Sequence, residues 1–277
     1  MEYVEAGEAR IPKIGLGTWQ NEGQACVDAV RTALELGYRH VDTAQMYENE
    51  AAVGRAIEAA DVSRDDLFLT TKVWRSNLRH DDVIESVETS LDELDVEYVD
   101  LLLIHWPHPR VPLDETLSAM AELREAGAVR HLGVSNFTAD QLRDAIRVSD
   151  SPIVADQVLY HPYTDQSELR SVCRQHDVAL TAYSPLARGA VLDDHRLAEI
   201  GDRYGKSPAQ VALRWLIQQD GVVAIPKASS REHLEANLAV FDFELSAAEV
   251  ERIDALRPGL RTRLYNLSPA IMRRNPF

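Results

Sequence analysis

Short apolar runs alternate with amphipathic segments along most of the chain. The runs are four to seven residues long and are predicted to be strands, at residues 14–18, 40–43, 67–72, 99–105, 130–135, 153–157, 179–183 and 222–226. The segments between them repeat apolar residues at helical spacing, as at Val83, Val87, Leu91 and Leu94, so that each would bury one face. This alternation is typical of a parallel sheet whose strands are joined by helical crossovers.

Turn and cap signals agree with this division. Thr138 followed by Gln141 resembles a capping box, and Pro208 directly after Ser207 indicates the first turn of another helix. Ahead of the first run, residues 4–11 are predicted to form a hairpin that turns at Gly7. After the last run we expect an extra helix at residues 246–256 and a short irregular C-terminal tail at residues 260–277.

Eight strand and helix units predict an α/β fold of the (β/α)8, or TIM-barrel, type. The 277 residues contain no linker, repeat or low-complexity tract, so a single domain over residues 1–277 is expected. The alternative is a doubly wound sheet with a nucleotide at its switch point. Its glycine fingerprint is incomplete here, because Gly15 and Gly17 are followed by Gln20 where the third glycine belongs.

Charge and composition narrow the function classes. The net charge of -16 disfavours nucleic acid and anionic membranes, which both need a basic face. No apolar run reaches about 18 residues and the N-terminus carries no hydrophobic signal, so we expect a soluble, cytoplasmic protein. We also expect a monomer. Cys26 and Cys173 are isolated and expected to be reduced, and no His, Cys or carboxylate set has metal-site spacing.

Lysine is scarce: four lysines stand against 25 arginines. An acidic, lysine-poor surface is typical of proteins kept soluble in concentrated salt, and we hold a halophilic origin as a hypothesis beside a GC-rich genome. Loss of fold or activity on dialysis to low salt would support it, and indifference to salt would remove it. Two of the lysines, Lys72 and Lys227, nevertheless fall at the ends of predicted strands.

The C-terminal ends of the strands carry the site in a barrel of this type. The polar residues that close the runs are Asp42, Lys72, His105, Ser135 with Asn136, Gln157, Tyr183 with Ser184, and Lys227. Tyr47 follows Asp42 by five residues. If the runs are neighbouring strands, Asp42, Tyr47, Lys72 and His105 form one proton-transfer site.

These four side chains suit the protonation of a carbonyl oxygen. The Lys72 cation would favour the Tyr47 phenolate and so ease proton donation, and Asp42 would hold Lys72 charged through a buried ion pair. His105 would hydrogen-bond the carbonyl oxygen beside the Tyr47 hydroxyl. None of the four can supply hydride, so a nicotinamide cofactor is required.

At this point the sequence resembles the aldo-keto reductase superfamily along nearly its whole length. Residues 37–54 match the first signature of that family, residues 133–137 resemble its central motif, and residues 225–227 with Asn237 resemble its last. The resemblance implies NAD(P)H-dependent reduction of an aldehyde or ketone, with Tyr47 as proton donor supported by Asp42, Lys72 and His105. The substrates it suggests are small dicarbonyls or keto sugars, such as methylglyoxal or diketogluconate.

The resemblance also assigns cofactor and substrate contacts. Ser135, Asn136 and Gln157 would hold the nicotinamide carboxamide, Tyr183 would stack on the ring, Ser184 and Leu186 would lie along the pyrophosphate, and Lys227, Ser229 and Asn237 would belong to the adenosine end. Three tryptophans would wall the substrate pocket: Trp19, Trp74 and Trp106. Trp215 is left for the core, and three further histidines are expected at the surface: His108, His161 and His176.

The last motif departs from the family pattern. Ala228 stands where Ser or Thr is usual, and His233 replaces an arginine that commonly holds the 2′-phosphate of NADP. Arg231 lies nearby in sequence and is a candidate substitute. We therefore expect NADPH to be preferred, with NADH use also possible.

Structural alternatives accompany each assignment. Asp42 could be a turn residue, Tyr47 or His105 packed side chains, and Lys72 a solvated charge. Ser135 and Asn136 could cap a helix, Gln157 could satisfy a loop, and Tyr183 and the three tryptophans could simply pack at the barrel rim. Two other function classes stay open: a nicotinamide-binding regulatory module without useful turnover, and a barrel lyase using Lys72 as a Schiff-base nucleophile.

Overall fold

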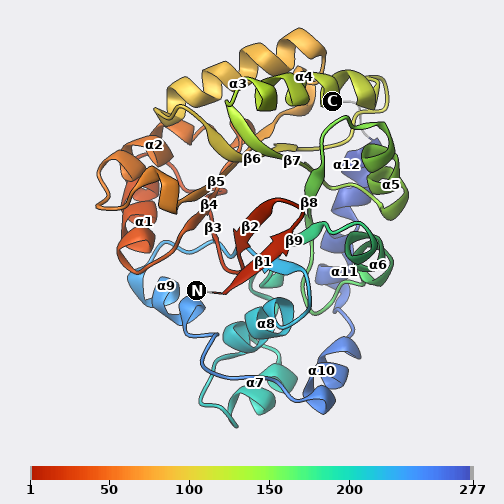
Figure 1. Cartoon of the computed structure of the whole chain (residues 1–277). Coiled ribbons are helices and arrows are strands. Elements are labelled where there is room, and N and C mark those ends of the chain that lie inside the picture. The colour runs from red at the N-terminus through yellow and green to blue at the C-terminus, as the bar shows by residue number, and fades with distance from the viewer. Residues whose placement is uncertain (1, 275–277) are drawn as a thin grey trace.

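Eight parallel strands curl into a barrel in the computed structural model, which describes residues 2–274 (Figure 1). The strands lie in chain order around the sheet. They are β3 (Leu16–Gly17), β4 (His40–Asp42), β5 (Phe68–Val73), β6 (Val99–Ile104), β7 (Val129–Ser135), β8 (Ile153–Leu159), β9 (Ala179–Tyr183) and β10 (Val222–Ala224). The predicted eight strands are confirmed, with ends that differ from the prediction by at most two residues.

The barrel closes between its first and last strands. Parallel bridges join Ile14 to Ala224 and Gly17 to Lys227. A Cβ on Gly17 would lie 2.8 Å from the Ile225 carbonyl oxygen, so only glycine lets the two backbones approach this closely. The seam therefore brings Lys227, at the end of the last strand, beside the first strand.

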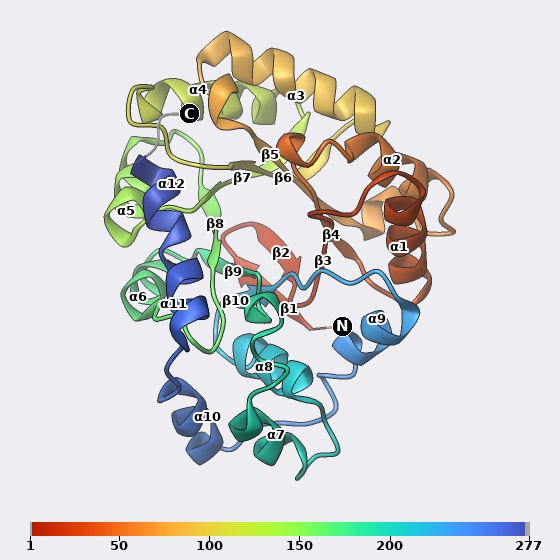
Figure 2. The same ribbon diagram turned by 180° about the vertical axis from the view of Figure 1, so that it is seen from behind.

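Helices link successive strands and cover the outside of the barrel (Figures 1 and 2). They are α1 (Gly23–Glu35), α2 (Glu50–Glu58), α3 (His80–Leu94), α4 (Leu113–Glu125), α5 (Ala139–Val148), α6 (Ser167–Gln175), α7 (His195–Gly201), α8 (Pro208–Ile217) and α9 (Arg231–Leu238). Capping boxes at Thr138 and Ser207 begin α5 and α8, as predicted. Helix α3 buries Val83, Val87 and Leu94, and Leu91 is half-buried.

The N-terminal hairpin closes one end of the barrel. Strands β1 (Tyr3–Ala6) and β2 (Ala9–Pro12) pair around Gly7, as expected. Val4 and Ile11 form a second apolar cluster with side chains from the barrel interior, among them Phe68 and Leu103. Because this end is plugged, access to the barrel is from the opposite end, where the strands finish.

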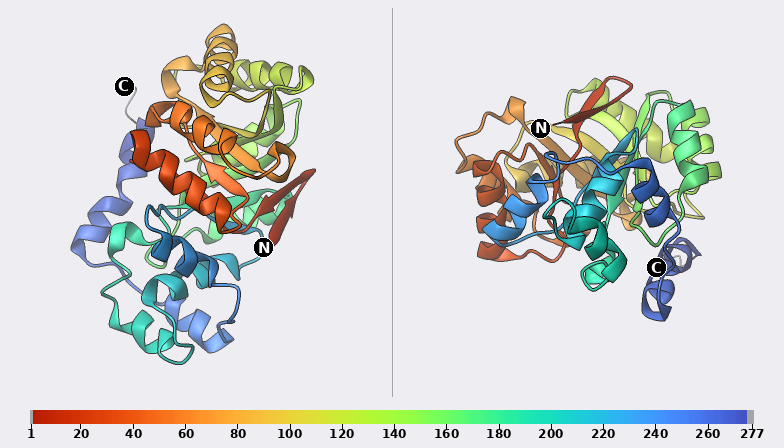
Figure 3. Two further views of the ribbon diagram at one scale, coloured as in Figure 1. Left: turned by 90° about the vertical axis from the view of Figure 1, so that its left-hand side faces the viewer. Right: turned by 90° about the horizontal axis from the view of Figure 1, so that it is seen from below.

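The C-terminal segment lies at that opposite end. After α10 (Ala247–Asp254), the chain forms α11 (Leu260–Asn266) and α12 (Ser268–Arg274), which face the viewer in Figure 2 and lie away from the hairpin in Figure 3. The expectation of an irregular tail was wrong over these residues; residues 275–277 lie outside the described part. Helices of seven residues are marginal on their own, so tertiary contacts, not local propensity, hold them.

Candidate active site

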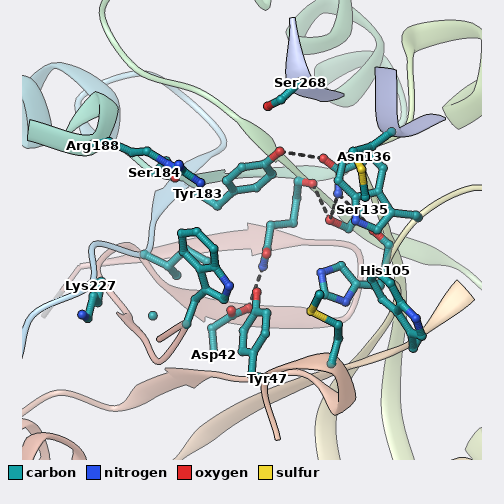
Figure 4. Close-up of a pocket in the computed structure, with 18 of the residues that line it drawn as sticks. Asp42, Tyr47, His105, Ser135, Asn136, Tyr183, Ser184, Arg188, Lys227 and Ser268 are labelled. Carbon is teal, nitrogen blue, oxygen red and sulfur yellow. Dashed lines mark hydrogen bonds between the residues drawn. The ribbon is translucent and has the colours of Figure 1, made fainter. Parts of the chain in front are cut away.

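A cavity of about 330 Å³ opens at the C-terminal ends of the strands (Figure 4). Residues from most of the barrel strands and from the C-terminal segment line it: Gly17, Trp19, Asp42, Met46, Tyr47, Trp74, His105, Trp106, Ser135, Asn136, Gln157, Tyr183, Ser184, Arg188, Ile225, Lys227, Tyr265, Ser268 and Met272. The predicted polar ring at the strand ends is thus brought together around one space.

A buried ion pair forms the floor of the cavity. The Lys72 Nζ donates to Asp42 Oδ1 at 2.6 Å and to the Thr43 carbonyl oxygen at 2.7 Å, and it lies 3.3 Å from the Tyr47 hydroxyl. The Lys72 side chain is 0% exposed and that of Asp42 is 2% exposed. Burial lowers the pKa of Lys72, and the adjacent Asp42 carboxylate opposes that effect.

The proton of Tyr47 is held tightly in this environment. Burial raises the pKa of Tyr47 well above its usual value, and the Asp42 charge adds to the rise. The Lys72 Nζ lies closer to Asp42, at 2.6 Å, than to the Tyr47 hydroxyl, at 3.3 Å, and the role expected of Lys72 in easing proton donation stays a prediction. Tyr47 is therefore a neutral phenol with a proton to give.

His105 is neutral at physiological pH. Burial lowers the pKa of its imidazole well below 6.5, and the Lys72 charge lowers it further. Its ring stands edge-on to Tyr47, with centroids 5.7 Å apart, and to Trp74 at 5.1 Å. The buried Nδ1 has no hydrogen-bond partner among the described residues, which favours the tautomer with its proton on Nε2. Such a ring can donate one hydrogen bond to an oxygen in the cavity.

The turn that carries Tyr47 is fixed by polar residues around it. Tyr47 lies in the 3-10 helix η1 (Gln45–Tyr47), and Glu48 after it is left-handed with φ 54°. The buried Asn49 amide donates to the Thr18 and Asn21 carbonyl oxygens, at 3.0 and 2.9 Å. These contacts tie the end of η1 to the loop after β3, which holds the Tyr47 side chain over the barrel.

Helix α2 is anchored directly after this turn. The buried Glu50 accepts hydrogen bonds from Thr71, next to Lys72 on β5, and from Ser90 on α3. A Cβ on Gly54 would collide with the Leu94 carbonyl at the end of α3, so α2 and α3 can pack only with glycine there. Residues 37–54 therefore contain two residues expected to take part in proton transfer, Asp42 and Tyr47, together with residues that position them.

Gln157 has a contact that the sequence did not foretell. Its Nε2 donates to Asp42 Oδ2 at 2.6 Å, so Lys72 and Gln157 occupy both carboxylate oxygens. Ser135 Oγ donates to the Gln157 carbonyl oxygen at 2.8 Å. Two of the three residues expected at a nicotinamide carboxamide, Ser135 on β7 and Gln157 on β8, are thereby connected to Asp42.

Asn136 joins the strand ends on the other side of the cavity. Its Nδ2 donates to the His105 carbonyl oxygen at 3.0 Å, and its Oδ1 accepts from the Tyr183 hydroxyl at 2.8 Å (Figure 4). Asn136 is left-handed, with φ 64°, a conformation that asparagine tolerates better than most residues. The sharp bend places its amide between β6 and β9.

The adenosine-end residues are arranged differently. Lys227 lines the cavity, whereas Leu186, Ser229, Arg231 and Asn237 are not among its described lining residues. Arg231 donates to Glu35 on α1 at 2.7 Å and also pairs with Glu235 at 3.8 Å. The candidate substitute for the missing arginine is therefore engaged by two acids. Asn237 is buried in α9 beside the Tyr38 hydroxyl.

The aromatic residues mostly lie where the sequence suggested. Trp19, Trp74 and Trp106 line the cavity, and Trp215 is in the core, where its Nε1 donates to Asp254. His161 is fully buried, contrary to the surface expectation, because it lies under the C-terminal segment near Asn266. Both cysteines are free and buried.

Sequence reasoning missed several lining residues. Met46 is next to Tyr47 and could have been included on that ground, and Arg188 lies in the loop that follows β9. Three others come from the C-terminal helices: Tyr265, Ser268 and Met272. No spacing signal marked these three, because their helices have no obvious period of buried residues.

Comparisons with known proteins agree with this geometry. Residues 13–258 match the sequence model of the Aldo/keto reductase family. A 9,11-endoperoxide prostaglandin H2 reductase of Trypanosoma cruzi (strain CL Brener) is 41% identical over 256 residues, which are 91% of this chain and 90% of the relative. A methylglyoxal reductase, DkgB, of Escherichia coli O157:H7 is 41% identical over 249 residues, 89% of this chain and 93% of the relative.

A solved structure extends the comparison to three dimensions. An aldo-keto reductase of Bombyx mori, in complex with NADP, superposes with a TM-score of 0.86 at 33% identity, covering 91% of each chain. Separately, among residues 2–274 no helix is long and apolar enough to cross a membrane.

Proposed function

The chain belongs to the aldo/keto reductase family of carbonyl-reducing oxidoreductases, and from that premise we propose that it reduces small aldehydes and ketones with Tyr47 as proton donor. The single observation that carries the proposal is the buried chain of contacts from Asp42 through Lys72 to the Tyr47 hydroxyl, with neutral His105 beside it at the cavity floor. The dinucleotide, when bound, supplies the hydride.

The cavity residues fit such a cofactor. Polar side chains of Ser135, Asn136 and Gln157 gather at the strand ends, where a carboxamide would find both donors and acceptors. Lys227 faces the same cavity and is in no ion pair with any described residue, so its charge is free for a phosphate. Tyr183 offers a ring between these two groups (Figure 4).

The chain's own residues would divide the proton transfer among them. The Tyr47 hydroxyl and the His105 Nε2–H would both donate to the substrate oxygen, which polarises the carbonyl bond. As Tyr47 gives up its proton, the Lys72 ammonium 3.3 Å away would stabilise the phenolate that forms. Asp42 keeps Lys72 charged for this step, and Gln157 keeps Asp42 in place.

NADPH is the cofactor that we favour, with NADH also used. Lys227 supports binding of a phosphorylated adenosine, but Ala228 is buried and carries no hydroxyl, and the exposed His233 stands where the family commonly has an arginine, so a 2′-phosphate finds fewer partners here. Arg231 would have to leave Glu35 to contribute. Discrimination between the two nucleotides should therefore be weaker than in a chain with a free arginine.

Small dicarbonyls and keto sugars are the proposed substrates. A relative at 41% identity is named a methylglyoxal reductase, and the 330 Å³ cavity must hold the nicotinamide as well as the substrate. The Schiff-base lyase alternative loses support, because Lys72 is fully buried and its Nζ contacts three oxygens instead of the cavity.

The test combines nucleotide titration with turnover. NADPH and NADH are titrated by fluorescence, and absorbance at 340 nm then follows reactions with methylglyoxal, phenylglyoxal and simple aldehydes. Tyr47→Phe should bind NADPH normally and lose about 10²- to 10⁴-fold in turnover, the range of general acid catalysis. Tyr160→Phe is the matched control, since its buried hydroxyl bonds Gln219 away from the cavity.

The outcomes separate the alternatives. Failure of the unmodified chain to bind either nucleotide would overturn the proposal. Tight nucleotide binding without turnover of any carbonyl would favour a regulatory module. Trapping of a substrate on Lys72 by borohydride, with no nicotinamide requirement, would favour the lyase.

A further inference from the structure

Arg188 is a cation at the rim of the cavity that the proton-transfer residues do not use. Its guanidinium carbon lies 5.0 Å from the centroid of the Trp19 ring and 4.4 Å from that of Tyr265. One ring follows the first barrel strand and the other belongs to α11, so the arginine spans the rim between the barrel and the C-terminal segment. Such stacking fixes a side chain that would otherwise be mobile.

The backbone of this loop is held in an uncommon conformation. Ser184, Ala187 and Arg188 are all left-handed, with φ of 50°, 50° and 52°. None of them is glycine, and non-glycine residues in this region persist where the surrounding structure holds them, often at ligand clamps. Here Tyr265 supplies such support, because its hydroxyl donates to Ser184 Oγ at 3.0 Å. Arg188 is thus preorganised on both its backbone and its side chain.

The charge around Arg188 is unbalanced in a way that favours an anion. Among the described residues its guanidinium forms no ion pair, and its contacts are with the Trp19 and Tyr265 rings. Asp42 is the only acidic residue among the described lining residues, and both of its oxygens are taken by Lys72 and Gln157. The cavity of a protein with net charge -16 therefore presents two cations, Arg188 and Lys227, and no free acid.

We propose that Arg188 binds a carboxylate on the substrate, so that the enzyme prefers carbonyl compounds that are also acids over neutral ones of the same size. This rests on the proposed function, which gives Lys227 to the dinucleotide. Arg188 packs instead against Trp19 and Tyr265, which wall the rest of the cavity. A guanidinium fork matches a carboxylate in two places, which a lysine cannot do.

A pair of substrates that differ only in this charge tests the proposal. 4-Formylbenzoate and methyl 4-formylbenzoate carry the same aldehyde, one with a carboxylate and one with its neutral ester. The unmodified enzyme should show the lower KM for the acid. Arg188→Gln should raise the acid-to-ester KM ratio by about 10-fold or more, the worth of a hydrogen bond to a charged group. Arg188→Lys should keep part of the preference for the acid that Arg188→Gln loses. Arg174→Gln, on the exposed face of α6, should leave the KM ratio unchanged.

Binding measurements identify the source of the anion. Benzoate, which cannot react, should bind the enzyme with NADP⁺ by calorimetry and lose affinity in Arg188→Gln, whereas the NADPH dissociation constant should stay within about twofold. A large loss of NADPH affinity with an unchanged KM ratio would overturn the proposal and assign Arg188 to the diphosphate. An unchanged KM ratio with unchanged NADPH affinity would also overturn it. If the unmodified enzyme reduced the ester but showed no preference for the acid, this inference alone would fail; absence of turnover with both of these aldehydes and with methylglyoxal would remove the proposed function as well.

Discussion

The two ends of the cavity are built in opposite ways. At the proton-transfer end, Asp42, Lys72 and His105 are almost completely buried and joined by short contacts to one another or to neighbouring strands. Around the proposed adenosine end, Lys227 and Arg231 are exposed, and Arg231, which is not among the described lining residues, is paired with acids on α1 and on its own helix. One end belongs to the barrel core, and the other to its surface.

This difference indicates which substitutions should destabilise the protein. A substitution at the buried end disturbs packing, charge balance and chemistry together, since a lone charge left in the core is strongly unfavourable. An exposed pair contributes little to stability, so residues such as Ala228 and His233 can vary without cost to the fold. On the proposed roles, substitutions that change cofactor preference should therefore cost less stability than substitutions of the proton-transfer residues.

Two lysines allow the sharpest test of this contrast, beginning with the buried one. Lys72→Met should lower kcat by about 10³-fold, because the developing Tyr47 phenolate loses its cation. It should also destabilise the fold by about 3–5 kcal/mol, since Asp42 is left as an uncompensated buried charge. Turnover at 340 nm and urea unfolding measure the two effects.

A double variant separates the loss of activity from the loss of stability. Asp42→Asn with Lys72→Met removes both charges, and it should recover much of the lost stability while remaining inactive. If Lys72→Met kept more than a tenth of the normal kcat in a folded protein, the assignment of Lys72 would be wrong.

The exposed lysine should show the opposite pattern. Lys227→Met should weaken NADPH binding by about 10-fold, through the loss of one charge-assisted contact to phosphate, and leave kcat at saturating NADPH unchanged. Fluorescence titration gives the dissociation constant. A fall in kcat with normal NADPH affinity would contradict the proposal that Lys227 acts in cofactor binding and not in proton transfer.

A smaller effect is expected at the Glu35–Arg231 pair. Glu35→Gln removes the shorter of the two ion pairs of Arg231 and leaves only the longer one to Glu235, so NADPH affinity should rise about two- to fivefold while NADH affinity stays constant, in keeping with the modest strength of surface pairs. Glu199→Gln, which breaks the comparable Arg252 pair on the surface, is the control. Equal changes for both nucleotides would show that Arg231 does not discriminate between them.

The smallest expected effect is on the pH profile of kcat. Burial keeps the pKa of His105 well below 6.5, so the imidazole stays neutral as pH falls from 9 to 6. Burial keeps the pKa of Tyr47 well above 10, so its proton is retained as pH rises over the same range. A flat profile between about pH 6 and 9 follows, and a loss of activity centred near pH 6.5 would indicate a titrating histidine instead.

Much of the proposed proton-transfer site could be predicted, because most of its residues lie at the ends of regular elements. The apolar runs gave the strand ends, and in a parallel barrel all strand ends share one face, so Asp42, Lys72 and His105 had to meet. The protonation state of Tyr47 was not predictable in the same way. It depends on the burial of the Tyr47 hydroxyl and on the nearby Asp42 charge, which together raise its pKa, and no spacing in the sequence encodes either of them.

The C-terminal segment shows the limit of pattern reading most clearly. Three leucines in and directly after α11 are exposed, Leu260 at 76%, Leu264 at 63% and Leu267 at 54%. The helix therefore has no buried apolar face that a periodicity analysis could detect. Specific bonds hold the segment instead, from Tyr265 to Ser184, from Asn266 to the Tyr163 carbonyl oxygen, and from Arg75 to the Met272 carbonyl oxygen. Each joins residues that are far apart along the chain.

The sequence by itself determined the order of strands and helices, the barrel, and the identity of the polar residues at its open end. Those features follow from local periodicity and from the geometry of parallel strands, which act within a single segment or between neighbours. Only the tertiary structure decided that Gln157 binds Asp42, that Arg231 is engaged by Glu35, and that Arg188 stands between Trp19 and Tyr265. These contacts join distant segments, and their existence depends on distances of a few ångströms that only the folded chain sets.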